Sequence, residues 1–283
     1  EMDTKKFAAA RCIQCAMRVA LAKNELSRRK VRRFQNIQAD LDVENEAAHW
    51  IISFFLRLRE RRRRYKEDRR IAADKDRHGL QDLQDIVAPH RLETHLVDFS
   101  RPEVYQSFIG NLYRHHSTLH GLVNNAGLYH GKSVYDYSHE EVDEIWAVNL
   151  KSLVYLSKDF ALHEQRAPHT RSIINITSVA GEVGSMDALY GATKAGVIGL
   201  TKANAWNFAP RVRVNAVSPA LIRSTSIHDR IPEQRRKEYE RQEVLKEPIE
   251  PEGVADVIMF LLSDQSRHLT GKVIAVDNGA YPR

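Results

Sequence analysis

The residue types best suited to chemistry in this chain are a serine, a tyrosine and a lysine. Ser178 ends an apolar run, and Tyr190 and Lys194 follow in a Tyr-x-x-x-Lys pattern. Residues four apart lie on one face of a helix, so the phenol and the ammonium are expected to be neighbours. A phenol has a pKa of about 10 in water, and a nearby cation favours its phenolate. The pattern therefore predicts a proton-transfer site.

Such a site would suit hydride transfer to and from a carbonyl group. A reduced ketone becomes an alkoxide that takes a proton from Tyr190, while the Ser178 hydroxyl stabilises the developing charge on the substrate oxygen. Lys194 would also hold a ribose hydroxyl, and Asn149 would anchor a water linking Lys194 to solvent. Ser178, Tyr190, Lys194 and Asn149 are the candidate catalytic residues.

The elements that must position these residues alternate between strands and helices. Short apolar runs predict strands at 93–97, 121–124, 172–176, 212–217 and 272–276, and amphipathic windows predict helices at 138–163, 189–209 and 252–263. This alternation implies a parallel sheet covered on both faces, with ligands beyond the carboxyl ends of its strands. The predicted fold class is α/β, a Rossmann-like doubly wound sheet.

Candidate cofactor contacts lie at those strand ends. Asn124, Ala126 and Gly127 belong to an Asn-Asn-Ala-Gly run, where small residues let a flat cofactor approach the backbone. Asp98 ends another strand and would accept a hydrogen bond from an adenine amino group. Asp74, if it ends the second strand, would favour an unphosphorylated ribose and hence NAD, although Arg77 leaves NADP open.

Taken together, these motifs resemble the classical short-chain dehydrogenase/reductase family over residues 74–283. They are the Asn-Asn-Ala-Gly run, Asn149, Ser178, the Tyr-x-x-x-Lys pair and a C-terminal Val-Asp-Asn-Gly, in the family's order. The resemblance implies an oxidoreductase that uses NAD or NADP on a ketone or secondary alcohol. It also implies that a segment beginning at Pro219 contacts the nicotinamide through Ile222, with Ser224 where the family often has threonine. Members often self-associate through the helices that carry Asn149 and Tyr190.

The glycine-rich turn that holds the cofactor's pyrophosphate in this family is missing. No glycine precedes Gly79, so the usual cradle of backbone N–H groups is not expected. The sequence therefore predicts that the first strand and the glycine loop are absent. Three explanations stay open. Residues are omitted before Asp74, or residues 50–56 act as a substitute strand followed by a helix at 57–70 and a strand at 71–74, or the segment is lost and the rest is kept as a scaffold.

Residues 1–70 are predicted to form a long basic α-helical extension. They hold 19 Lys and Arg against 10 Asp and Glu, and they contain no glycine. Cys12 and Cys15 are the only cysteines, too few for a zinc cluster, so no metal is expected and the thiols suit a reducing compartment. No apolar run has the length of a membrane span. We expect an intracellular location, in the cytoplasm or a cytoskeletal or ciliary assembly, rather than secretion.

Two stretches of this extension resemble the IQ motif, a basic amphipathic helix bound by calmodulin-like EF-hand proteins. The matching positions are Ile13, Arg18, Lys23 and Leu26 in the first copy and Ile52, Arg57, Arg62 and Tyr65 in the second. The resemblance implies helix-in-groove binding to an acidic partner. The arginine run at 61–64 lacks interleaved aromatic residues, which disfavours nucleic acid.

Two functions therefore compete. One is an active NAD(P)-dependent oxidoreductase. The other is a catalytically inactive scaffold subunit of a large assembly, for example a cytoskeletal or ciliary one, which recruits a calmodulin-like protein.

Overall fold

The computed structural model describes residues 50–53, 95, 97–105, 107–116, 119–163 and 171–281. Within these ranges the elements, in chain order, are β1 (Trp50–Ser53), α4 (Pro102–Tyr105), α5 (Phe108–His115), β2 (Leu119–Asn124), η2 (Val134–Asp136), α6 (His139–Trp146), η3 (Ala147–Lys151), α7 (Ser152–Leu162), β3 (Arg171–Ile176), α8 (Ala180–Val183), α9 (Ala188–Asn207), β4 (Val212–Pro219), α10 (Ser226–Arg230), α11 (Glu233–Gln242), α12 (Pro251–Leu262), η4 (Asp264–Ser266) and β5 (Val273–Val276). No helix in these ranges is long and apolar enough to cross a membrane.

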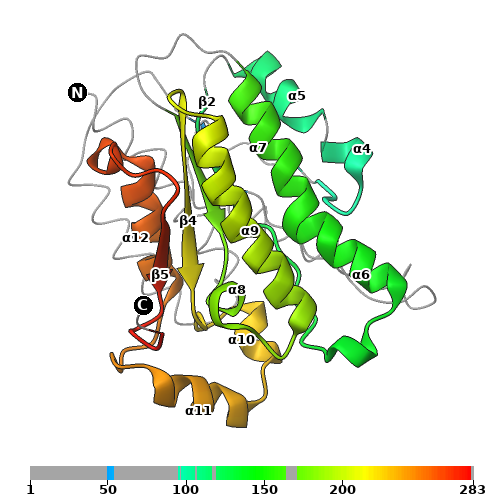
Figure 1. Cartoon of the computed structure of the whole chain (residues 1–283), viewed down its shortest axis with the longest axis vertical. Coiled ribbons are helices and arrows are strands. Elements are labelled where there is room, and N and C mark those ends of the chain that lie inside the picture. Colours follow the sequence, from blue (N-terminus) through cyan, green and yellow to red (C-terminus); the bar gives the residue numbers. More distant parts are fainter. Residues whose placement is uncertain are drawn as a thin grey trace.

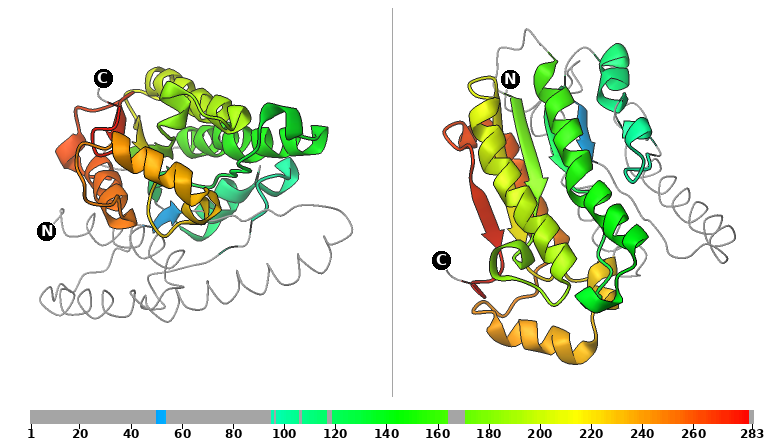
Figure 2. Two further views of the ribbon diagram at one scale, coloured as in Figure 1. Left: turned by 90° about the horizontal axis from the view of Figure 1, so that it is seen from below. Right: turned by 45° about the vertical axis from the view of Figure 1, so that its right-hand side comes forward.

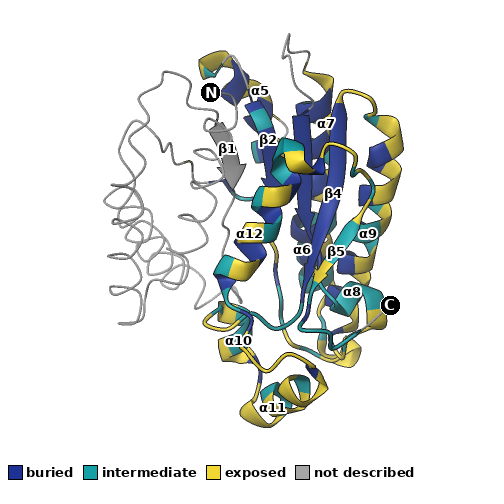
Figure 3. Ribbon diagram, turned by 90° about the vertical axis from the view of Figure 1, so that its left-hand side faces the viewer, coloured by how far each residue is buried: buried dark blue, intermediate teal, exposed yellow. Residues whose placement is uncertain are grey.

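The strands form one parallel sheet in the order β1-β2-β3-β4-β5. Every residue of β3 and β4 is buried, as expected for a parallel sheet covered on both faces. Figure 1 shows α7 and α9 side by side on one face of the sheet, while α12 packs against the other face. Figure 3 shows the buried strands between these helices, whose outer faces are exposed. This arrangement confirms the predicted α/β fold.

Each face of the sheet has its own apolar core. One core joins α4, α5, α7 and α9 to the sheet through side chains such as Tyr105, Leu122 and Phe160. The other core joins α12 to the sheet through side chains such as Ile174, Val217 and Ile258. Because both faces are filled, the free space for a ligand lies at the strand ends. Figure 2 shows α10 and α11 near the end toward which the strand arrows point.

Four of the five predicted strands are confirmed. The runs at 121–124, 172–176, 212–217 and 272–276 correspond to β2, β3, β4 and β5. The run at 93–97 falls mostly outside the described residues, and Val97, which is described, belongs to no strand. The predicted helix at 138–163 is divided into α6 and α7 by the π-helix η3, which contains Asn149.

The strand β1 corrects the prediction that the first strand is absent and that residues 1–70 are helical throughout. Trp50–Ser53 pairs in parallel with β2, with Ile52 opposite Leu122 and Ser53 opposite Val123. This agrees with the explanation that residues 50–56 supply a substitute strand. The strand fits because the edge of β2 would otherwise carry unpaired backbone groups. The proposed helix at 57–70, the strand at 71–74, Asp74 and the first IQ-like copy lie outside the described residues.

Candidate active site

Three elements bring the predicted catalytic residues together at the carboxyl end of the sheet. Ser178 follows β3, Tyr190 and Lys194 lie in the first two turns of α9, and Asn149 projects from η3. Tyr190 is 8% exposed and Lys194 is 5% exposed. The Lys194 ammonium lies 5.7 Å from the centroid of the Tyr190 ring, as the four-residue spacing predicts. Ser178 is half-buried beside them.

The electrostatics of Tyr190 differ from the expectation. Burial raises the pKa of Tyr190 to about 12, whereas a hydrogen bond with the Ser178 side chain lowers it and the negative charge of Asp187 raises it. The expected lowering of this pKa by Lys194 is not seen, and the cost of removing a phenolate from water dominates. Tyr190 is therefore protonated at neutral pH in this structure, as a proton donor must be.

Lys194 is held by the sheet below it. Its Nζ donates a hydrogen bond to the carbonyl oxygen of Ile176, the last residue of β3, at 2.8 Å. Burial lowers the pKa of Lys194 to about 8, so the side chain keeps most of its charge at neutral pH. A charged, anchored ammonium beside the phenol can hold a hydroxyl group of a ligand and stabilise negative charge nearby.

Asn149 connects the loop after β2 to α9. Its Oδ1 accepts a hydrogen bond from the Leu128 N–H at 2.7 Å, and its Nδ2 donates to the Leu128 carbonyl at 2.9 Å and to the Thr193 hydroxyl at 3.1 Å. The side chain is fully buried. The amide thus fixes the backbone next to Lys194, and its expected role in anchoring a water stays a prediction.

Gly127 lies next to Lys194 and Asn149. A Cβ atom there would lie 3.4 Å from the Lys194 Nζ and 3.6 Å from the Asn149 Oδ1. Gly127 is exposed, while the adjoining Ala126 is buried. The glycine thus brings an exposed stretch of backbone, without a side chain, next to the Lys194 ammonium. The residues present therefore fit the nicotinamide and ribose half of NAD or NADP.

Three further candidates cluster after β4. Pro219 ends the strand and its carbonyl accepts a hydrogen bond from the Val179 N–H at 3.2 Å, which places it next to the Ser178 turn. Ile222 is half-buried, and Ser224 is exposed with a φ of 62°. A positive φ is uncommon for serine and marks a sharp change of direction before α10. Pro219 and Ile222 thus lie at and just after the end of β4, and their expected contact with a nicotinamide ring stays a prediction.

Two candidates make hydrogen bonds within the fold, although the buried Oδ1 of Asn124 has no hydrogen-bond partner among the described residues. The Nδ2 of Asn124 donates to the Asn175 Oδ1 at 2.8 Å and to the Ser157 hydroxyl at 3.1 Å, which ties β2 to β3 and α7. The Oδ1 of Asp98 accepts from the Ser100 N–H at 3.0 Å and from its hydroxyl at 2.6 Å, in a turn after the apolar segment. The Asn124 amide nitrogen therefore joins β2 to β3 and α7, and Asp98 stabilises a local turn, while their expected cofactor contacts stay predictions.

The residue that sequence reasoning missed is Asp187, the N-cap of α9. Its carboxylate contacts Tyr190 and the loop after β2 and is nearly inaccessible to solvent. The signal was present, because an aspartate immediately before a helix is a common N-cap. Tyr129 was also missed; its ring meets that of Tyr190 edge-on, with centroids 5.1 Å apart.

Comparison with known proteins finds relatives of this chain. Residues 68–281 match the family model described as enoyl-(acyl carrier protein) reductase. The chain is 32% identical over 193 residues to the 3-oxoacyl-(acyl-carrier-protein) reductase FabG of Thermotoga maritima, covering 68% of this chain and 78% of that protein. It is 38% identical over 169 residues to 2-(S)-hydroxypropyl-CoM dehydrogenase 3 of Xanthobacter autotrophicus, covering 57% and 66%.

A solved structure is also similar to this chain. The crystal structure of a short-chain dehydrogenase/reductase from Brucella melitensis, titled glucose/ribitol dehydrogenase, superposes with a TM-score of 0.65 at 30% identity, covering 74% of this chain and 83% of that one. The match over most of the chain, together with Ser178, Tyr190 and Lys194 at the strand ends, shows that this chain belongs to the short-chain dehydrogenase/reductase family.

Proposed function

We propose that this chain interconverts a ketone and a secondary alcohol, using NAD or NADP. The observation that carries the proposal is the buried Tyr190 phenol with the Lys194 ammonium 5.7 Å from its ring centroid, beside the exposed backbone of Gly127. The names of the two relatives describe a reductase of an oxo compound and a dehydrogenase of a hydroxy compound, the two directions of such a reaction.

The chain's own residues would handle the proton and the substrate oxygen. When bound, NADH or NADPH supplies the hydride that reduces the carbonyl carbon. The Ser178 hydroxyl would donate a hydrogen bond to the carbonyl oxygen, and Tyr190 would give its phenolic proton to that oxygen as it becomes an alkoxide. Lys194 would stabilise the resulting phenolate until a proton from solvent restores it, so that one hydride and one proton are consumed.

Cofactor binding and the Tyr190→Phe variant test the proposal. NADH or NADPH fluorescence should change on titration with the full chain, and the variant should bind the cofactor with similar affinity while losing at least about 100-fold in turnover of a small ketone. Lack of binding of either nucleotide at millimolar concentration would exclude the oxidoreductase function.

A scaffold function is the second candidate. No glycine occurs between Ser53, the end of β1, and Gly79, so the segment after this strand cannot copy the family's glycine-rich turn. A chain that binds neither NADH nor NADPH yet folds and enters a stable assembly would favour this function.

The basic extension is proposed to bind a calmodulin-like EF-hand protein through the first IQ-like copy. Ile52, the leading apolar position of the second copy, belongs to β1, where it pairs opposite Leu122. A segment paired in a sheet cannot at the same time present a helix to a groove. Calmodulin should therefore shift the full chain in gel filtration, and Ile13→Glu should abolish the shift. Equal shifts for the wild-type chain and the Ile13→Glu variant would count against this proposal.

Self-association through α7 and α9 is also proposed. Figure 1 shows these helices side by side, and Val154 and Leu162 of α7 and Trp206 of α9 are exposed. Exposed apolar residues gathered on neighbouring helices are typical of protein–protein contacts.

A further inference from the structure

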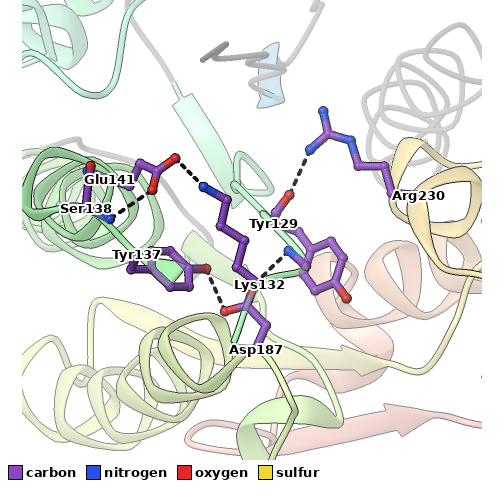
Figure 4. Close-up of polar contacts among 8 residues, drawn as sticks. Tyr129, Lys132, Tyr137, Ser138, Glu141, Asp187 and Arg230 are labelled. Carbon is purple, nitrogen blue, oxygen red and sulfur yellow. Dashed lines mark hydrogen bonds and ion pairs between the residues drawn. The ribbon is translucent and has the colours of Figure 1, made fainter. Parts of the chain in front are cut away.

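A buried carboxylate links the loop after β2 to the first turn of the catalytic helix. Asp187 is 2% exposed and accepts three hydrogen bonds. The Gly131 N–H donates to its Oδ2 at 2.9 Å, while the Tyr137 hydroxyl at 2.7 Å and the Tyr190 N–H at 3.0 Å donate to its Oδ1. Figure 4 shows the Tyr137 hydroxyl pointing at this carboxylate.

The loop that Asp187 holds forms the wall beside the reactive phenol. The Tyr129 ring packs edge-on against the Tyr190 ring, with 5.1 Å between centroids. The Tyr129 carbonyl accepts a hydrogen bond from Arg230 of α10 at 2.8 Å, as Figure 4 shows. Farther along the loop, Lys132 pairs with Glu141 of α6 at 2.5 Å. The wall is therefore fixed to three helices, and Asp187 provides its contact with the first turn of α9.

We propose that Asp187 is a positioning residue for Tyr190, which holds the phenol and the wall formed by residues 129–137 as one body. The inference rests on the proposed oxidoreductase function. Displacing a catalytic group by about 1 Å can cost a hundredfold in rate, so side chains that lock such a group are functionally important. A carboxylate bonded to both the Tyr190 backbone and the facing loop is such a lock.

The chemistry of the three donors requires aspartate rather than asparagine. An ionised carboxylate presents acceptors only, whereas an asparagine amide presents one acceptor oxygen and one donor nitrogen. In Asp187→Asn the amide nitrogen would face either the Gly131 N–H or the two donors on Oδ1. At least one of the three hydrogen bonds would be lost, although the side chain keeps its size.

The first test measures the loop without relying on turnover. Hydrogen–deuterium exchange of the full chain should be about tenfold faster across residues 128–137 in Asp187→Asn than in the wild type, because at least one of the three hydrogen bonds of Asp187 is lost. Tyr137→Phe should accelerate the same peptide to a smaller extent. Asp136→Asn is the matched control, since it removes the same charge from an exposed position of the same loop, and it should change nothing.

The second test measures the reaction with ethyl acetoacetate, a small 3-oxo ester, as the probe. Asp187→Asn should lower kcat about 10- to 100-fold with a smaller change in KM, and Tyr137→Phe should act in the same direction. Ketone reduction needs the protonated Tyr190 phenol, so its rate should fall at high pH. The midpoint of this fall should move to lower pH in Asp187→Asn, which loses a negative charge near Tyr190, and not in Tyr137→Phe. A merely structural cap would not produce this difference.

The outcomes separate the inference from the proposed function. Wild-type exchange and wild-type kcat in a folded Asp187→Asn protein would overturn the inference while leaving the oxidoreductase function intact. A wild-type chain that neither binds NADH nor turns over would end the proposed function, and the exchange measurement would then decide whether Asp187 holds the loop. Should Asp187→Asn not fold, Tyr137→Phe answers the same question, and unchanged exchange there counts against the inference.

Discussion

Tyr190 and Lys194 illustrate how burial sets the chemistry available to individual residues. Burial disfavours the charged form of each, so the pKa of the phenol rises to about 12 and that of the ammonium falls to about 8. At neutral pH the pair is a protonated phenol beside a cation, which is ready to donate a proton to an alkoxide. Oxidation of an alcohol needs the phenolate, so a higher pH should favour that direction.

Replacement of Lys194 should change how stability depends on pH. The folded chain releases the Lys194 proton at about pH 8, whereas the unfolded chain keeps it to about 10.5. Between these values the unfolded state binds more protons, so the wild-type free energy of unfolding should rise with pH by about 2 kcal/mol. Lys194→Met should lack this rise. Denaturant unfolding of both proteins between pH 8 and 10 measures the difference.

Tyr190 sets the upper limit of that measurement. Its folded pKa of about 12 exceeds the ordinary value of 10.0, so the unfolded chain loses this proton first and stability should fall above pH 10.

Lys202→Met is the control for Lys194→Met. It changes an exposed lysine of the same helix and should follow the wild-type curve. Identical curves for Lys194→Met and wild type would show that burial does not lower the pKa of Lys194.

At the scale of elements, the close approach of α8 to α9 places Ser178 near Tyr190. Gly181 begins this contact, because a Cβ atom there would lie 2.5 Å from the Lys194 carbonyl carbon and 2.6 Å from the Ala195 nitrogen. Both neighbours are backbone atoms of a long helix and cannot rotate away. The glycine therefore fixes how near the serine turn lies to the catalytic helix.

Gly181→Ala should accordingly destabilise the chain by about 1–3 kcal/mol through overpacking, and it should impair turnover by moving Ser178 away from Tyr190. Gly253→Ala is the matched control. Gly253 lies in the first turn of α12 with no atom within 4 Å of an added Cβ, so its replacement should be neutral or stabilise by about 0.5 kcal/mol. Thermal unfolding of both variants compares them, and equal stabilities would refute the proposed close contact.

The elements also show how far the sequence can be interpreted. The Tyr190–Lys194 spacing and the apolar runs of β2 to β5 depend on local periodicity, and they predicted the catalytic helix and four strands. The direction of the Asn124 amide depends on partners in β3 and α7, which no local pattern contains. Strand β1 has no glycine turn to mark it, and its pairing with β2 is a contact between segments far apart in sequence. The π-helix at Asn149 was likewise not predictable, because its periodicity is that of a continuous helix.

At the scale of the whole molecule, the sheet faces are filled but the outer faces of α7 and α9 are not fully polar. Leu162 is 62% exposed at the end of α7, and Trp206 is 88% exposed near the end of α9. Earlier in α9, the exposed positions include Ala192, Ala195 and Gly199. Their small size would allow another helix to approach closely. A second copy of the chain would bury these residues.

We therefore predict that the chain self-associates and that single charges on this face prevent it. Leu162→Glu and Trp206→Glu should each reduce the mass measured by light scattering to that of one chain, because a buried unpaired carboxylate costs several kcal/mol at an interface. Tyr135→Glu should keep the wild-type mass, since Tyr135 is 93% exposed but lies on η2 rather than on α7 or α9. A monomeric wild-type chain would show that this contact does not form. A Trp206→Glu variant of unchanged mass would place the contact elsewhere. The apolar side chains would then remain in water, which is tolerable for residues that are scattered over the surface.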